Sequence, residues 1–299
     1  MRFHTPLRYP GGKIKLANFI KLIIKENQLQ DQSYIELYAG GAGVALSLLL
    51  DEYVSCIHIN DLDYNIYAFW HSVINNSEEM SRQIQSVNVT MSEWFKQKEI
   101  YNNPEQHSLF EVGFATFFLN RTNRSGILTA GVIGGKKQDG PWRLDARFNK
   151  KNLIARIERI GRFKSRINLY QSDAAKFITD VLPTLPENSL AYLDPPYYVK
   201  GQGLYANYYR HDDHKQIADL VLNIQQKWMV SYDNADQVRD LYKMCNSLEY
   251  SLSYSAQQRY KGTEVMFFCD SLCIPQVVNP AKVTKQCVNS HQQLTLFPA

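Results

Sequence analysis

Apolar and polar residues alternate along the first third of the chain in a pattern that predicts an α/β fold. Short apolar runs rich in β-forming residues, at 33–38 and 56–60, predict strands. The apolar run 44–50 and the amphipathic run 15–25 predict helices. A glycine-rich turn, 39–43, stands between the first strand and the helix that follows it. Strand, turn, helix and strand in this order make a βαβ unit.

The middle of the chain follows a different pattern, and the α/β pattern then returns. Helices are predicted at 77–87 and 92–101, before a glycine-rich, basic segment from 120 to 147. The returning elements are strands at 166–170, 189–193 and 228–232, helices at 174–181 and 214–226, and a hairpin of 248–255 with 264–269. We therefore expect a main α/β domain of residues 1–73 and 168–278, a mainly helical insert of residues 74–167, and a flexible tail of residues 279–299.

The composition adds to this picture by excluding several classes of protein. Hydrophobic residues make up 44% of the 299 and charged residues 21%, which excludes disorder over the whole chain. The five cysteines include no C-x-x-C pair, so a disulfide scaffold or zinc ribbon is not expected. The segment 1–13 lacks the apolar core of a signal peptide, and the apolar run 39–50 is shorter than the ~20 residues that span a bilayer. An intracellular, reducing location without membrane contact follows.

The glycine turn is a candidate nucleoside-binding element. Gly40, Gly41 and Gly43 follow a strand and open a helix, where glycines allow a tight turn and close approach of a ligand. Asp61 ends the next strand, where a carboxylate can accept both ribose hydroxyls. The pattern suits NAD, FAD or S-adenosylmethionine, or a turn that only packs helix against strand.

The sequence Asp194-Pro195-Pro196-Tyr197 favours one of these cofactors. Successive prolines have no N–H donors, so this corner offers only acceptors, and the Asp adds two more. Such a pocket suits an exocyclic amine. Hydrogen bonds to Asp194 and the Pro195 carbonyl would make its lone pair available for attack on a methyl sulfonium, while Tyr197 stacks on the base. The alternative is a turn after an edge strand, with the Asp as a helix cap.

With these motifs the chain resembles the DNA adenine-N6 methyltransferase (Dam) family, D12 class. The matching elements run in family order over most of the chain: 7–13 (LRYPGGK), 36–43 (ELYAGGAG), 60–61 (ND), 118–121 (FLNR) with Gly126, 194–197 (DPPY) and 261–264 (KGTE). The resemblance implies a Rossmann-like S-adenosylmethionine-dependent methyltransferase sheet with an inserted, mainly helical target-recognition subdomain. It also implies methyl transfer from S-adenosylmethionine to N6 of adenine in double-stranded DNA, by base flipping and direct displacement, without a metal.

The resemblance also assigns roles to single residues. It makes Asp194, Pro195, Pro196 and Tyr197 catalytic. The implied cofactor-binding residues are Tyr9, Lys13, Glu36, Tyr38, Gly40, Gly41, Gly43, Asp61, Asp173 and Asp194. Lys13 could instead be a solvated lysine, and Asp173 could cap the helix that follows it. Ala42 departs from the family pattern, which commonly has glycine there, and Tyr38 stands for the family's aromatic in this loop.

The charge distribution fits a DNA-binding insert. The net charge is only +4, but residues 121–166 hold thirteen Lys and Arg against three acidic residues. Phosphate contacts need such a basic segment, although a solvated basic helix at 150–166 would have the same composition. The expected DNA-binding residues are Asn120, Arg121, Asn123, Arg124, Lys136, Lys137 and Arg143. The segment 120–126 differs from the pattern of enzymes that read GATC, so the target sequence is open.

Other chemistries are less well supported. A cytosine-C5 methyltransferase needs a nucleophilic cysteine, usually after proline, and no Pro-Cys pair occurs. In 134–137 (GGKK) a lysine stands where a phosphate-binding loop needs Ser or Thr. His211 and His214 are expected at a solvated helix start rather than on a metal. Methylation of cytosine N4 or of RNA, and a catalytically silent DNA-binding homologue, remain alternatives.

The last residues suggest a second partner. Gln293 to Phe297 (QLTLF) resembles the short peptides by which bacterial DNA-working proteins dock on the replication sliding clamp. A segment that packs on its own domain is the alternative. With the family resemblance, this motif predicts a cytoplasmic protein of bacterial or phage origin.

Overall fold

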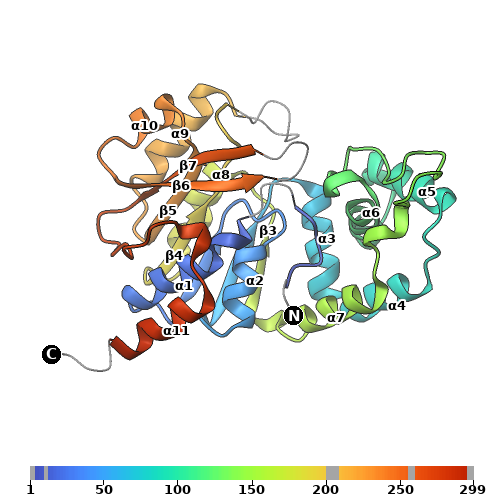
Figure 1. Cartoon of the computed structure of the whole chain (residues 1–299), viewed down its shortest axis with the longest axis horizontal. Helices are drawn as coiled ribbons and strands as arrows, with labels where there is room; N and C mark the ends of the chain where they lie inside the picture. Colours follow the sequence, from blue (N-terminus) through green and yellow to red (C-terminus); the bar gives the residue numbers. More distant parts are fainter. Residues whose placement is uncertain (1–3, 10–12, 200–208, 255–259, 295–299) are drawn as a thin grey trace. The chain divides into compact units, whose positions relative to one another are not determined.

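The computed structural model describes residues 4–9, 13–199, 209–254 and 260–294 (Figure 1). The chain forms two compact units. Unit 1 comprises Met1–Gly12, Ala39–Gly43 and Asn60–Gln171. Unit 2 comprises Lys13–Tyr38, Val44–Ile59 and Ser172–Ala299. The expected insert, 74–167, lies wholly within unit 1.

The described strands form one mixed sheet in the order β3-β2-β1-β4-β5-β7-β6. Their bounds are β1 Ser33–Glu36, β2 Cys56–Asn60, β3 Ile167–Tyr170, β4 Ser189–Leu193, β5 Lys227–Asp233, β6 Asn246–Tyr254 and β7 Tyr260–Phe268. β1 pairs in parallel with β2 and β4, β4 pairs in parallel with β5, and β7 is antiparallel to β5 and β6. This order confirms the predicted Rossmann-like α/β fold class.

The strand register determines where loops leave the sheet. Glu36, the last residue of β1, is level with Ile59 of β2 and Tyr192 of β4. Because these strands are parallel, the loops that follow them leave the same edge. The order also reverses between β1 and β4, and ligands of open α/β sheets bind beyond the carboxyl ends of the strands at such a switch point.

The helices surround the sheet strands in unit 2 and form most of unit 1. Their bounds are α1 Ala17–Glu26, α2 Gly43–Leu50, α3 Tyr64–Asn75, α4 Ser77–Ser86, α5 Met91–Asn102, α6 Leu109–Thr122, α7 Lys150–Gly161, α8 Ala174–Lys176, α9 His211–Val221, α10 Asp236–Leu241 and α11 Lys285–Leu294. In unit 2, α9 and α10 lie on one side of the strands and α1 and α11 on the other (Figure 1). Among the described residues, none of the helices is both long and apolar enough to cross a bilayer.

Unit 1 has an aromatic core around α6. The helix begins with a capping box, in which Ser108 and Glu111 satisfy each other's backbone N–H groups. Phe117 lies stacked near Phe69 of α3, with ring centroids 6.2 Å apart, and contacts Phe148 edge-on at 5.5 Å. Each such fully buried phenyl ring contributes ~2 to 3 kcal/mol of transfer free energy. This core holds α6 and the loop after it in place.

Two predicted helices differ in their bounds. The helix expected at 214–226 instead covers His211–Val221. It begins earlier because the Asp213 carboxylate accepts the Arg210 N–H (2.7 Å) and caps an earlier turn. The helix expected at 174–181 is α-helical only to Lys176, and a wider π-turn covers Phe177–Val181. Pro183 follows this turn, and its ring cannot continue a regular helix.

The expected flexible tail is wrong for residues 285–294, which form α11. Val288 of this helix is buried, and its carbonyl accepts a hydrogen bond from Lys25 Nζ of α1 (2.6 Å). Asn18 of α1 likewise donates to the Val283 carbonyl (2.9 Å). These tertiary contacts with α1 stabilise a helix that could not be predicted from its polar sequence.

Candidate active site

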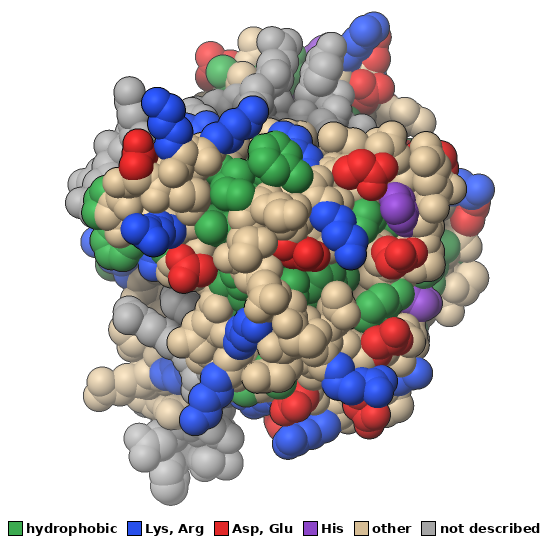
Figure 2. Space-filling model, turned by 90° about the vertical axis from the view of Figure 1, so that its right-hand side faces the viewer, with side chains coloured by type: hydrophobic (Ala, Val, Ile, Leu, Met, Phe, Trp, Pro, Cys, Tyr) green, Lys and Arg blue, Asp and Glu red, His purple; other side chains and the backbone are tan. Residues whose placement is uncertain are grey.

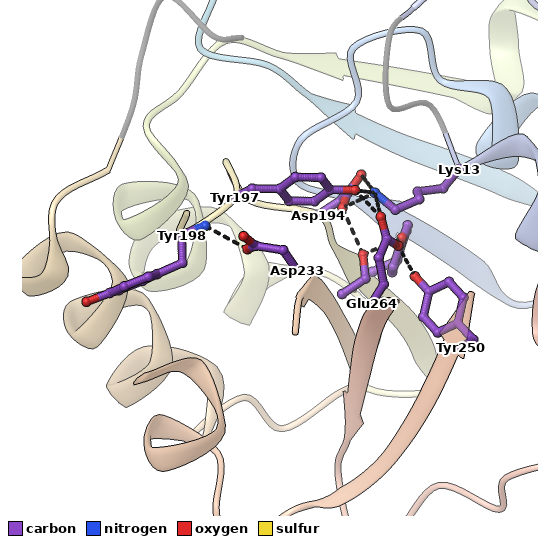
Figure 3. A network of polar contacts seen from close by, with 9 residues as sticks. Lys13, Asp194, Tyr197, Tyr198, Asp233, Tyr250 and Glu264 are labelled. Carbon is purple, nitrogen blue, oxygen red and sulfur yellow. Dashed lines mark hydrogen bonds and ion pairs between the residues drawn. The ribbon is translucent and has the colours of Figure 1, made fainter. Parts of the chain in front are cut away.

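A hydrogen-bonded network surrounds Asp194 at the carboxyl end of β4 (Figure 3). Lys13 Nζ donates to both carboxylate oxygens of Asp194, at 2.7 Å to Oδ1 and 2.8 Å to Oδ2. The Ser231 hydroxyl of β5 also donates to Oδ1 (2.8 Å) and lies 2.8 Å from the Tyr192 hydroxyl. The structure thus brings two predicted residues, Lys13 and Asp194, into direct contact within unit 2.

The hydroxyl of Tyr197 joins this network to a second carboxylate. It accepts a hydrogen bond from Lys13 Nζ (2.8 Å) and donates to Glu264 Oε1 of β7. Tyr250 of β6 donates to the other oxygen of Glu264. The Lys13 ammonium also lies 4.8 Å from the centroid of the Tyr197 ring. Tyr197 is therefore held by hydrogen bonds at its hydroxyl and by the ammonium next to its ring.

Among the described side chains of this network, that of Asp194 is the most exposed to solvent. The Asp194 side chain is 19% exposed, whereas those of Lys13 and Glu264 are 3% and 1% exposed. Burial raises the pKa of Glu264, the nearby Asp194 charge raises it further, and the Lys13 ammonium opposes both effects. Burial likewise raises the pKa of Tyr250 well above its usual value. Of these three charged side chains, that of Asp194 is the one accessible to a ligand.

A third carboxylate, that of Asp233, fixes the backbone after the Asp-Pro-Pro-Tyr segment. Asp233, at the end of β5, accepts the backbone N–H groups of Tyr198 (2.8 Å) and Val199 (2.9 Å). The phenol of Tyr198 points away from the network, and its hydroxyl lies 3.0 Å from His211 Nδ1 of α9 (Figure 3). Asp233 therefore fixes where the chain goes after Tyr197.

The glycine turn, in unit 1, is built around Tyr9. Gly40 has φ +45°, and a Cβ there would lie 2.6 Å from Tyr9 Cε1. A Cβ on Gly41 would lie 2.8 Å from Tyr9 Cβ. Ala42, where the family commonly has glycine, also has a left-handed φ of +44°. The two glycines thus give room to a side chain of the protein itself.

Asp61 is bonded to the same turn. Its Oδ2 accepts the Gly40 N–H (2.7 Å) and its Oδ1 accepts the Asp63 N–H (3.0 Å). Burial raises the pKa of Asp61 to about 6, against the opposing effect of these two hydrogen bonds. Each oxygen has two acceptor sites, so each retains one after these bonds. The carboxylate therefore fits a pair of neighbouring hydroxyls, such as those of a ribose.

Three other predicted cofactor residues, Glu36, Asp173 and Tyr38, have partners in unit 2. The buried Glu36 accepts the Ala45 N–H at the start of α2 (3.0 Å). Asp173 caps α8 by accepting the N–H groups of Ala175 (2.9 Å) and Lys176 (3.3 Å), as the alternative interpretation expected. The Tyr38 hydroxyl lies 3.1 Å from that of Tyr209. Gly43 is the first residue of α2.

Two predicted DNA-binding asparagines are part of the interior of unit 1. Asn120 is 1% exposed, and its amide bonds both backbone groups of Arg8 and the Gly126 carbonyl. Asn123 is fully buried and accepts a hydrogen bond from Trp94 Nε1 (2.7 Å). Both amides hold the loop after α6, and because both are buried, neither side chain is accessible to a base.

Arg121 belongs to a cluster of arginines in unit 1. Its Nε donates to the Arg147 carbonyl (2.8 Å) and its Nη1 to the Pro6 carbonyl (3.4 Å). Burial, followed by the positive charges of Arg8, Arg156 and Arg147, lowers the pKa of Arg121 to about 9. Because the Arg121 guanidinium donates to these backbone carbonyls, we interpret it as a support of the loop rather than as a group that reads a base.

The remaining predicted DNA contacts are exposed: Arg124, Lys136, Lys137 and Arg143. The face shown in Figure 2 is not a uniform basic surface, because Lys and Arg side chains alternate there with Asp and Glu. These four cations are therefore accessible, as are Arg147, Lys151, Arg162 and Lys164 of the same basic segment.

Two further expectations concern metals and the tail. His214 is not solvated as expected: it is fully buried on the inner side of α9, and burial lowers its pKa to about 4. Among the described residues, no group of three or more His, Cys, Asp and Glu side chains could hold a metal. The clamp-like segment 293–297 lies outside the part of the chain whose side chains the structure describes.

The sequence did not single out four residues of the network: Ser231, Asp233, Tyr250 and Glu264. Glu264 stands in the family-like segment 261–264, which was the one available signal. The other three lie on β5 and β6, and nothing in their local sequence marks them. Only the placement of β7 between β5 and β6 brings them together.

Comparison with known proteins identifies related sequences. The model of the D12 class N6 adenine-specific DNA methyltransferase family matches residues 9–258. The modification methylase LlaI of Lactococcus lactis subsp. lactis is 22% identical over 297 residues, which cover 84% of this chain and 46% of that protein. The chain thus spans about half the length of this curated relative.

Comparison with solved structures finds only distant similarities. The rRNA methyltransferase aviRa from Streptomyces viridochromogenes has a TM-score of 0.37 at 10% identity, over 87% of this chain and 86% of that one. TrmK of M. capricolum, in complex with S-adenosyl-homocysteine, has a TM-score of 0.35 at 6% identity, over 92% and 82%. The fold assignment rests on the strand order described above.

Proposed function

Because the chain belongs to the D12 class N6 adenine-specific DNA methyltransferase family, we propose that it methylates N6 of adenine in double-stranded DNA. The observation that carries the proposal is Asp194, the solvent-reached end of the network, followed by two prolines. Oδ1 of Asp194 accepts two hydrogen bonds and Oδ2 accepts one. Oδ2 therefore has an acceptor site left for an amine N–H.

In this proposal, the protein activates the target amine by hydrogen bonding. Asp194 Oδ2 and the Pro195 carbonyl accept its two N–H bonds and turn the lone pair toward the methyl donor. Pro196 and Tyr197 shape the pocket, and the Tyr197 ring stacks on the base. A base inside a duplex cannot reach such a pocket, so the adenine flips out of the helix.

We further propose S-adenosylmethionine as the methyl donor, which supplies a methyl group on a positively charged sulfur. The acceptor sites left on Asp61 fit its ribose hydroxyls. Tyr9, Lys13, Glu36, Tyr38, the glycine turn and Asp173 would line the rest of the site. Glu36 ends β1 and Asp194 follows β4, and these two strands of unit 2 are parallel, so both residues lie at one edge of the sheet, which supports their place in this set.

DNA contacts are proposed for the exposed cations of unit 1, Arg124, Lys136, Lys137 and Arg143. Asn120, Arg121 and Asn123 would act on DNA indirectly, through the loop that they hold. Action on bacterial or phage DNA would place the protein in the cytoplasm of a bacterial cell.

A methyl-transfer assay on duplex DNA with methyl-labelled S-adenosylmethionine tests the proposal. Wild type should yield N6-methyladenine, and Asp194→Ala should lose transfer by at least ~100-fold while its duplex affinity stays within about threefold. Asp212→Ala, which removes an exposed carboxylate on α9, is the matched control and should retain full activity.

Each other result would replace the proposal by a named alternative. N4-methylcytosine as the product, or transfer only to RNA, would change the substrate. Absence of label transfer together with DNA binding would indicate a catalytically silent homologue. Full activity of Asp194→Ala would refute the assigned site.

A further inference from the structure

The network around Asp194 contains an excess of acidic groups. Lys13 supplies one positive charge, and Asp194 and Glu264 supply two carboxylates. The Glu264 carboxylate lies 3.9 Å from Lys13 Nζ, further than the 2.7 Å between Lys13 and Asp194. With both carboxylates ionised, this group has a net charge of −1, and with Glu264 protonated it is neutral.

The groups that face Glu264 are otherwise uncharged hydroxyls. Tyr197 and Tyr250 donate to its two oxygens, and Tyr192 lies close enough to sense its charge. Asp233 is its register partner on β5, but that carboxylate bonds the backbone N–H groups at 198 and 199. Two hydroxyl donors and one ammonium are therefore what can keep Glu264 ionised.

The proposed reaction moves positive charge to the target nitrogen. N6 forms a bond to the methyl carbon as the bond between that carbon and sulfur breaks. The positive charge of sulfur passes to nitrogen, which then loses one proton to solvent. A carboxylate at N6 favours this change, but an ammonium paired with that carboxylate cancels much of its effect.

We propose that Glu264 is a positioning residue of the proposed methyl-transfer site: its carboxylate offsets the charge of Lys13, so that Asp194 presents net negative charge to the amine, and fixes Tyr197 through its hydroxyl. This inference rests on the proposed function and assigns a role to a residue outside the Asp-Pro-Pro-Tyr segment. It predicts that the rate of transfer depends on the ionisation of Glu264.

A purely structural Glu264 would behave differently. If it only satisfied the Tyr197 and Tyr250 hydroxyls, glutamine would replace it almost fully, because the amide oxygen accepts hydrogen bonds in the same place. Loss of the charge would then leave the rate unchanged. Glu264→Gln therefore separates charge from shape.

The test measures single-turnover transfer to duplex DNA against pH, at saturating S-adenosylmethionine. Wild type should lose rate about tenfold per pH unit below a midpoint that lies above the usual range of a glutamate. Glu264→Gln should lower the plateau by about 10- to 100-fold, abolish this acid limb and leave the affinities for cofactor and DNA within about threefold. Glu249→Gln, an exposed change on the neighbouring strand β6, should match wild type.

Tyr250→Phe provides an independent test that removes one hydroxyl. Glu264 loses a donor to its charged form, so the midpoint of the acid limb should rise by about one pH unit. An unmoved limb in Tyr250→Phe, or a wild-type rate and profile in Glu264→Gln, would overturn the inference even though methyl transfer occurs. Wild type without any transfer would overturn the proposed function and this inference with it.

Discussion

Asp61 links the charge state of one side chain to two opposite effects of pH. Burial raises its pKa to about 6, above the ordinary 3.8 of an aspartate, so folding favours the protonated carboxyl. This stabilising contribution is fully present below the unfolded pKa and is lost as pH rises toward 6. The proposed binding of ribose hydroxyls uses the ionised form, which is lost as pH falls below 6.

We therefore expect the affinity for S-adenosylmethionine to fall about tenfold per pH unit below pH 6, measured by calorimetry on the protein without DNA. Over the same range, the contribution of Asp61 to the free energy of unfolding should increase. Asp61→Asn should bind the cofactor weakly at every pH and show neither trend. A flat affinity between pH 5 and 7 in wild type would contradict the role of Asp61.

Asn123 illustrates how a residue predicted for binding serves folding instead. Its amide accepts from Trp94 and donates to the carbonyls of Ile127 (3.2 Å) and Leu128 (2.8 Å). Asn123→Ala would remove the partner of the buried Trp94 Nε1–H and one hydrogen bond from each of the two half-buried carbonyls, of which that of Ile127 keeps the Ala130 N–H. We therefore expect a loss of ~2 to 4 kcal/mol in the free energy of unfolding. Denaturant unfolding measures it, with the exposed Asn88→Ala as control. A loss equal to that of the control would refute the scaffold role.

At the scale of elements, variants of the glycine turn can show why position 40 is glycine: because of the Tyr9 ring or because of the backbone conformation. Gly40→Ala combines a left-handed φ with a clash at the Tyr9 ring, and it should cost more than ~1 to 2 kcal/mol of stability and weaken cofactor binding. Gly135→Ala has φ +69° and nothing within 4 Å, so it measures the backbone effect alone. Thermal unfolding compares the two.

The double variant Gly40→Ala with Tyr9→Ala gives the second half of this test. Removing the ring relieves the clash but not the backbone strain, so the added cost of Gly40→Ala should fall to that of Gly135→Ala. If Gly40→Ala costs no more than Gly135→Ala when Tyr9 is present, the turn is not built around Tyr9.

The elements differ in how far local sequence determines them. The βαβ pattern of 33–60 predicted β1, α2 and β2 to within about two residues, because buried parallel strands and an apolar helix have strong periodicity. α11 could not be predicted, since its stability depends on contacts with α1 rather than on its own pattern. The Asp-Pro-Pro-Tyr corner was found from local chemistry, whereas Ser231 and Glu264 required the strand order.

At the scale of the whole molecule, the small net charge of +4 conceals the basic segment 121–166. The structure subdivides that segment: Arg121 is bound internally, while Arg124, Lys136, Lys137 and Arg143 are exposed. Only exposed cations can release counterions from DNA. The number of phosphate contacts should therefore be smaller than the number of basic residues.

We expect the DNA association constant to fall steeply with salt, and Arg124→Ala to reduce the magnitude of the log–log slope by about one. Fluorescence anisotropy across a salt series measures both. Lys243→Ala, an exposed change in unit 2, should leave the slope unaltered. An Arg124→Ala slope identical to that of wild type would remove Arg124 from the phosphate contacts.

The network around Asp194 has a consequence for how the protein is made. The hydrogen bonds of Lys13 to Asp194 join residues 181 positions apart, and that of Tyr197 to Glu264 joins residues 67 apart. Contacts of such long range form late, because closing long loops costs entropy before any contact offsets it. During synthesis, a ribosome must release β7 before Lys13 and Tyr197 find their second carboxylate. Methyl transfer should consequently return only in the slowest phase of refolding, after most of the helical signal has recovered.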